Sequence, residues 1–221
     1  MYGARLDVLA VLLGRLSTET GGRPLSTSGV RKQVDRWKGS NLVRVERALG
    51  QSWVTLTRHG YDRAGLPYGV WAVPVTRVRH VHCVNAVRLW YEGLNYQGAK
   101  LADRFPWVSE RTLFVERGRE ASWHIPDGVI EDPNSPAAGP VRHIAIEVEL
   151  THKGRRAYDE EVFAKLRAGI ELLQYFVPTE EFAQRLRSDL QTVVEGRGSK
   201  KQFRVQLLPH VSGLSYQGMG W

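Results

Sequence analysis

The hydrophobic positions of residues 1–68 follow a helical period first and a strand period afterwards. Leucines recur at three- to four-residue spacing over Leu6–Leu16, which predicts an amphipathic helix. A second helix is predicted over Gly29–Trp37, where the apolar positions share one face, with Ser26 or Ser28 as its N-cap. The region therefore begins with two helices that each have one apolar side.

A β-hairpin is predicted directly after these helices. Two strand-like runs, Leu42–Arg47 and Trp53–Thr57, flank Gly50, and a short helix is expected over Arg58–Gly65. Helices followed by a hairpin are the order of a winged helix-turn-helix. We expect such a domain over residues 1–68, followed by a connector at 69–74 that contains Gly69 and Pro74.

From residue 75 the pattern changes to alternating strands and helices. The predicted elements are a helix over 75–91, strands over 107–116, 123–130 and 142–151, a helix over 154–168, a strand over 170–177, a helix over 179–194 and a strand over 203–208. The helical crossover between two strong strands predicts a parallel pair in a mixed sheet. The predicted fold class is α/β (α+β), with a domain over 75–208 and an irregular tail over 209–221.

Positive charge is concentrated in the first predicted domain. The 221 residues carry a net charge of +8, and residues 1–68 hold 11 Lys and Arg against 5 Asp and Glu. This asymmetry predicts a polyanion-binding module, with double-stranded DNA as the first candidate. The residues expected to contact DNA are Ser28, Arg31, Lys32, Arg36 and Lys38 on or beside the second helix, and Arg44 and Arg47 on the hairpin. A merely solvated basic surface, or a winged helix used for protein contact, remains an alternative.

Several classes of protein are disfavoured by composition. The longest apolar run, Val8–Leu13, is far shorter than a membrane helix, and no secretory leader is evident. The single cysteine, Cys83, excludes an internal disulfide framework and a Cys-rich zinc site. No Walker-type phosphate loop is present. We expect a cytoplasmic protein with no membrane partner.

A group of acidic residues in the second predicted domain indicates metal chemistry. Alternation along the strand places Glu147 and Glu149 on one face, and Asp127 follows Pro126 near the neighbouring strand. Asp127, Glu147 and Glu149 are expected to converge on one hard cation, Mg²⁺ or Mn²⁺, with Lys153 positioned to neutralise a phosphate or orient a water. This arrangement is suited to phosphodiester hydrolysis.

A purely structural role is an alternative for each of these residues. Glu147 and Glu149 are equally compatible with the exposed face of an antiparallel sheet, where Lys153, Arg155 and Arg156 would pair with them. Asp127 with the following glycine also fits a simple turn. His124 and His152 flank the acids, and a structural role is the more frequent one for such histidines.

The acidic motif resembles that of the PD-(D/E)XK nuclease superfamily. The resemblance rests on Pro126-Asp127, a spacer, and Glu147-Val-Glu149 after an apolar run, with Glu149 where the family usually has lysine. It implies that Asp127 and Glu147 are metal ligands and that Glu149 or a migrated Lys153 acts near the attacking water. An additional acid from an earlier element is implied at Glu110 or Glu92.

Residues 5–178 also resemble the actinobacterial replication-relaxation family of plasmids and integrative elements. The matching stretches are Leu25–Leu66, His80–Trp90, Trp107–Arg111, His124–Val129 and Ala145–Lys153. This resemblance implies a winged helix joined to a PD-(D/E)XK-like domain and a role in replication, relaxation or transfer of mobile DNA. The resemblance to the nuclease superfamily implies a homodimer. Two functions follow as expectations: a Mg²⁺-dependent DNA endonuclease, or a non-catalytic replication, transfer or transcription factor with an inactive nuclease-like domain.

Overall fold

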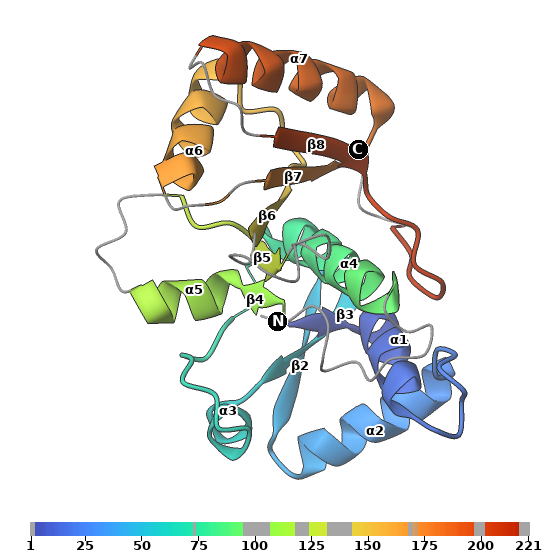
Figure 1. Cartoon of the computed structure of the whole chain (residues 1–221). Helices are drawn as coiled ribbons and strands as arrows, with labels where there is room; N and C mark the ends of the chain where they lie inside the picture. Colours follow the sequence, from blue (N-terminus) through green and yellow to red (C-terminus); the bar gives the residue numbers. More distant parts are fainter. Residues whose placement is uncertain are drawn as a thin grey trace, which may run out of the picture. The chain divides into compact units, whose positions relative to one another are not determined.

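The computed structural model describes residues 3–72, 74–94, 107–117, 124–131, 143–167, 170, 172–196 and 202–216. These described residues form a mixed α/β fold with one three-stranded and one five-stranded sheet (Figure 1). The chain forms two compact units, which we name unit 1 (residues 1–90 and 210–221) and unit 2 (residues 91–209). Within the described ranges, no helix has both the length and the apolar character that crossing a membrane requires.

Unit 1 contains the predicted helices and hairpin. Its elements are β1 (Ala4–Arg5), α1 (Leu6–Leu16), α2 (Thr27–Gly39), β2 (Val43–Ala48), β3 (Gln51–Leu56), α3 (Arg58–Arg63) and most of α4 (Val78–Leu94). The antiparallel sheet has the order β1-β3-β2. Leu49 and Gly50 join β2 to β3 with positive φ values of 49° and 71°, the backbone of a tight two-residue hairpin turn.

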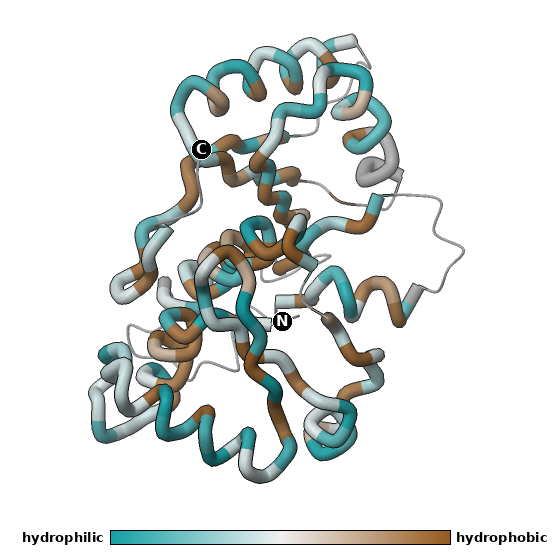
Figure 2. The backbone as a smooth tube through the Cα atoms, turned by 180° about the vertical axis from the view of Figure 1, so that it is seen from behind, coloured by the Kyte–Doolittle hydropathy of each residue, from teal (hydrophilic) through white to brown (hydrophobic). Residues whose placement is uncertain are grey.

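The second helix starts where the sequence places it. The Ser26 hydroxyl accepts a hydrogen bond of 3.2 Å from the Gly29 amide, which makes Ser26 the N-cap of α2. Val30 and Val34 on its inner face are buried, and the residues between them are largely exposed. Hydrophilic and hydrophobic residues accordingly alternate along α2 in Figure 2, as they do along α7 of unit 2.

The core of unit 1 extends beyond the predicted 1–68 domain. Leu89 of α4 is completely buried with Val8 and Val54, and Val211 joins the same core from the segment after unit 2. Ser215 is held as well, because its amide donates a hydrogen bond of 3.3 Å to the Asp7 carboxylate. The boundary between units therefore falls at residues 90–91, later than the predicted connector, and the irregular segment 210–216 belongs to unit 1.

Unit 2 is built on the predicted mixed sheet. Its strands are β4 (Val108–Ser109), β5 (Gly128–Glu131), β6 (His143–Val148), β7 (Leu172–Val177) and β8 (Gln202–Leu207), and its helices are α5 (Glu110–Arg117), α6 (Arg155–Arg167) and α7 (Glu180–Gly196). The order is β4-β5-β6-β7-β8, antiparallel up to β6 and parallel from β6 to β8. The expected parallel pair, β6 and β7, is confirmed.

One predicted strand is wrong. Residues 107–116 form only the two-residue strand β4 before the chain turns into helix α5. The Ser109 hydroxyl accepts a hydrogen bond of 3.3 Å from the Thr112 amide, and Glu110 places a negative charge in the first turn. Both features favour a helix start, and they outweigh the apolar alternation on which the strand prediction rests.

Helices α6 and α7 cover the face of the sheet to which Ala145 and Glu147 point. Alternation along β6 and β7 places Ala145, Leu173 and Tyr175 in one core with Tyr158 of α6 and Leu186 of α7. Glu147 has the same parity as Ala145, so it lies on this covered face. The prolines and small residues of 131–139 predict a loop. Glu131 instead ends strand β5, and 132–139 lie outside the described residues.

Candidate functional site

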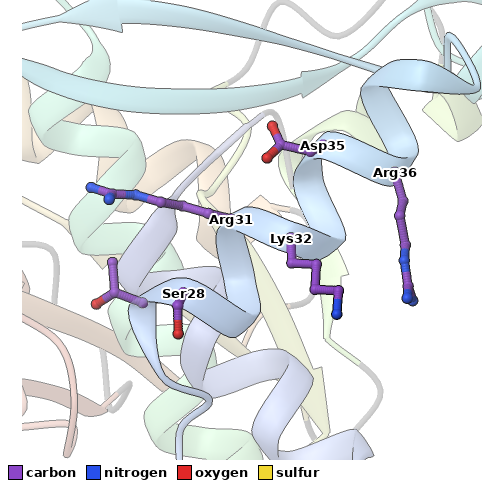
Figure 3. Close-up of a pocket in the computed structure, with 6 residues that line it drawn as sticks. Ser28, Arg31, Lys32, Asp35 and Arg36 are labelled. Carbon is purple, nitrogen blue, oxygen red and sulfur yellow. The ribbon is translucent and has the colours of Figure 1, made fainter.

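The outer face of α2 carries the predicted DNA-binding side chains of unit 1. Arg31, Lys32, Arg36 and Lys38 are all exposed, and the first three line a shallow surface hollow with Ser28 (Figure 3). No residue in the described ranges forms an ion pair with any of these four cations. Their charge is therefore available to an external polyanion.

The two arginines of the hairpin, Arg44 and Arg47, differ in whether their side chains already have partners within unit 1. The Arg44 guanidinium donates hydrogen bonds to the Thr55 hydroxyl (3.1 Å) and the main-chain oxygen of Trp71 (2.8 Å), and it pairs with Glu46 at 3.0 Å. Arg47 is exposed. Because Arg44 is held by acceptors within unit 1, Arg47 is the hairpin arginine suited to a phosphate contact.

Glu147 of β6 and Glu149, one residue after the end of β6, are both buried, so the alternative of a solvent-facing pair is wrong. Glu147 is 2% exposed and Glu149 is 3% exposed. The Glu149 amide donates a 2.9 Å hydrogen bond to the main-chain oxygen of Phe176, which continues the β6–β7 pairing. Helices α6 and α7 cover this face, and burying two like charges there is costly without a compensating cation.

Helix α6 adds a third buried carboxylate that sequence reasoning missed. Glu161 is 4% exposed and accepts a 3.1 Å hydrogen bond from the Tyr175 hydroxyl. The Lys153 ammonium group contacts the Glu149 carboxylate and lies 3.2 Å from that of Glu161. A signal was present, because Tyr158, Glu161 and Val162 share the buried face of α6, and a carboxylate among apolar neighbours at helical spacing is unusual.

His124 completes the group. Its Nδ1 lies 3.5 Å from the Glu147 carboxylate, and its Nε2 lies 4.0 Å from that of Glu161. His124, Glu147 and Glu161 each offer one ligand atom, and these atoms lie within 4.8 Å of one another. Two donors bound about 2.1 Å from one ion lie at most about 4.2 Å apart, so a closing movement of less than about 1 Å would fit them to one cation.

The predicted ligands Asp127 and Glu110 border this set. Asp127 Oδ2 accepts a 2.8 Å hydrogen bond from the Val148 amide, which fixes its carboxylate against the last residue of β6. The Glu110 amide donates a 3.3 Å hydrogen bond to the main-chain oxygen of Asp127. Among the described residues, the group within ligand reach of one ion contains neither. Glu92, the other acid implied by the resemblance, is likewise outside it.

Asp127 and Gly128 do not form the simple turn considered as an alternative. Gly128 opens strand β5 instead, and a Cβ atom at this position would lie 2.2 Å from the Trp107 ring. The glycine is therefore required because the indole packs directly on the backbone. This packing holds the segment that carries Asp127 next to β6.

The electrostatics of the cluster are dominated by burial and by its carboxylates. Burial raises the pKa of Glu149 to about 7, although Lys153 opposes the shift. Burial alone would lower the pKa of Lys153, but Glu161 and Glu149 together raise it above its usual value. The pKa of Tyr175 is also raised, by burial first and by Glu161 next. Lys153 thus stays charged beside the carboxyl groups of Glu149 and Glu161.

His152, the second histidine that flanks the acids in the sequence, is held by residues outside the carboxylate cluster. His152 Nε2 lies 3.0 Å from the Asp189 carboxylate, and its ring packs edge-on against Tyr158 and Phe182. Its partner is therefore an acid of α7 rather than the carboxylate cluster.

No protein-family model, no curated protein and no solved structure matches this chain.

Proposed function

We propose that this protein binds duplex DNA through α2 and hydrolyses phosphodiester bonds at the carboxylate cluster of unit 2 with a divalent cation. The observation that carries the proposal is the convergence of Glu147, Glu149 and Glu161 with His124 and Lys153. Of the three buried glutamates, Glu149 and Glu161 share the Lys153 ammonium group, so negative charge is left in an apolar setting, and a bound cation would offset it.

The donor set fits a divalent cation. Glu147, Glu161 and His124 would hold it, and carboxylate oxygens suit both Mg²⁺ and Mn²⁺. Imidazole is a ligand of transition metals more than of Mg²⁺, so the mixed set favours Mn²⁺. When bound, the cation would supply stabilisation of the negative charge that develops on the phosphate.

The other residues of the cluster have roles that follow from their positions. The Lys153 ammonium group, oriented by Glu149 and Glu161, would donate a hydrogen bond to a phosphate oxygen or hold the attacking water. Glu149 lies beside it and would accept a proton from that water. Asp127, fixed by the Val148 amide, would keep the β5 segment in register with these groups.

The test is cleavage of supercoiled plasmid by the full chain in Mg²⁺ or Mn²⁺. We expect nicking by the wild type, loss of at least about a hundredfold in Glu147→Ala and Glu161→Gln, and no change in Glu181→Gln, an exposed glutamate of α7. Thermal unfolding checks that each variant is folded, and the Mn²⁺-induced rise in melting temperature reports binding separately. Absence of cleavage by the wild type on supercoiled, linear and single-stranded DNA with both metals would reject the hydrolase.

A non-catalytic DNA-binding factor is the second candidate. It is favoured by one observation: Lys153 and the Tyr175 hydroxyl already satisfy Glu149 and Glu161 within the fold, as in a structural polar network. On this alternative the protein binds DNA with the same α2 face and gains no thermal stability from Mn²⁺. Either function is compatible with a role in replication, relaxation or transfer of mobile DNA, which we retain as a proposal from the sequence resemblance.

A further inference from the structure

Helix α2 places one acid within its basic face. Asp35 is exposed and lines the same hollow as Arg31, Lys32 and Arg36. Figure 3 shows two adjacent rows: Arg31 and Asp35 project to one side of the helix, and Lys32 and Arg36 project to the other. Each row has the four-residue spacing of neighbours on a helix surface.

The fold gives no structural reason for an aspartate at this position. No residue that the structure describes forms an ion pair or hydrogen bond with its carboxylate. Asp35 lies in the C-terminal half of α2, away from the first turn where the helix dipole favours an acid, and aspartate is a poor helix former. An arginine four residues before an acid is also the weaker orientation for a helical ion pair.

An acid is also unfavourable on a surface that contacts only the phosphates of DNA, because like charges repel. It becomes useful where it meets a hydrogen-bond donor in the major groove. Cytosine presents such a donor, its N4 amino group, which Asp and Glu accept, and guanine presents the O6 and N7 acceptors that Arg contacts with two hydrogen bonds. Arg31 and Asp35 therefore carry complementary base-reading groups side by side.

We propose that α2 reads base identity in duplex DNA, with Asp35 accepting from cytosine N4, Arg31 donating to guanine, and Lys32 and Arg36 contacting phosphates. This inference rests on the proposed binding of DNA by α2. Side chains one helical turn apart are about 5–6 Å apart, and successive bases rise about 3.4 Å along a strand. The preferred site accordingly holds a guanine and a cytosine within about two base-pair steps of each other.

The test is selection of bound duplexes from a random library by the full chain, followed by affinity measurements on the enriched sequences. We expect the wild type to enrich a motif with a fixed guanine and cytosine at this spacing. Asp35→Ala should lose the cytosine preference, roughly tenfold, while binding arbitrary duplexes at least as tightly as the wild type. Asp35→Asn should shift the preference at that position to adenine, because an amide pairs with adenine N6 and N7.

The matched control is Glu19→Ala, which removes one exposed acid of unit 1 outside α2 and should leave the motif unchanged. Enrichment of the same cytosine by wild type and Asp35→Ala would overturn the inference while DNA binding stands, as would tight binding by the wild type with no base preference. A wild type that binds no duplex at low salt would overturn the DNA-binding proposal itself. Since Asp35 is exposed, its substitution leaves the core intact, and a thermal melt verifies this.

Discussion

The Tyr175 hydroxyl donates a hydrogen bond of 3.1 Å to the Glu161 carboxylate, which joins strand β7 to helix α6 inside unit 2. Both side chains are buried, so neither has water as a substitute partner. Tyr175→Phe should lower the free energy of unfolding by about 2 kcal/mol, because hydrogen bonds to charged groups are worth about 1.5–3 kcal/mol. Urea denaturation measures this loss.

The control for this prediction is a double-mutant cycle with Glu161→Gln. If the hydroxyl acts through the Glu161 charge, the two substitutions should show a coupling energy of about 1–2 kcal/mol. Additive effects would show that Tyr175 stabilises unit 2 only by packing.

The exposed cations of α2 predict a defined salt dependence. Lys32→Ala and Arg36→Ala should each weaken binding uniformly across DNA sequences and reduce the slope of log affinity against log salt by about one. Arg185→Ala, which removes an exposed cation of α7, should leave the slope unchanged. Titrations at several salt concentrations measure it, and an unaltered slope in both α2 variants would place the phosphate contacts elsewhere.

His82 predicts a pH dependence of stability in unit 1. Burial, and secondarily Arg5, lowers the pKa of its imidazole from 6.5 to about 4. The folded state therefore favours the neutral ring. The contribution of this preference to the free energy of unfolding is fully present above pH 6.5 and is lost as the pH falls from 6.5 towards 4. For such a shift, the loss in free energy of unfolding should be on the order of 3 kcal/mol.

The variant that tests this is His82→Gln. Its amide can replace the 3.1 Å hydrogen bond between His82 Nε2 and the main-chain oxygen of Ser215, but it does not titrate. The difference in unfolding free energy between wild type and variant should shrink as the pH falls from 7 to 4.5. A difference that does not change with pH would contradict the prediction, and His59→Gln, at an exposed histidine of α3, is the control.

Gly128 predicts a packing defect next to the carboxylate cluster. A Cβ atom there meets the Trp107 ring at 2.2 Å, so Gly128→Ala forces the indole or strand β5 to move. We expect a loss of about 1–3 kcal/mol in unfolding free energy, as for other overpacked positions. The penalty should largely vanish in the double variant with Trp107→Leu. An equal penalty in both backgrounds would mean that the backbone conformation, and not the ring, requires glycine.

The local patterns of the sequence were sufficient for most elements of both units. Helix α2 and its Ser26 cap, the hairpin around Gly50 and the parallel pair β6–β7 follow from apolar spacing and turn chemistry over a few residues. Residues 107–116 show the limit of this reasoning. Their apolar alternation favours a strand, and the capping by Ser109 that makes them helical involves a single hydroxyl.

The extent of unit 1 could not be predicted from local sequence patterns. Leu89 and Val211 look like ordinary apolar residues in the sequence, and only packing assigns both to the core formed by α1 and β3. Contacts between residues so far apart leave no periodic signal, which is why the sequence placed the boundary at prolines and glycines instead.

By itself, the sequence determined where positive charge is concentrated and that Glu147 and Glu149 share one face of a strand, since both follow from order along the chain. The tertiary structure decided what that face meets. Helix α6 covers it and brings Glu161 beside Lys153, while the segment before β5 brings His124 beside Glu147. These partners come from separate elements, so their convergence depends on how the sheet and helix pack, a relationship that no local spacing encodes.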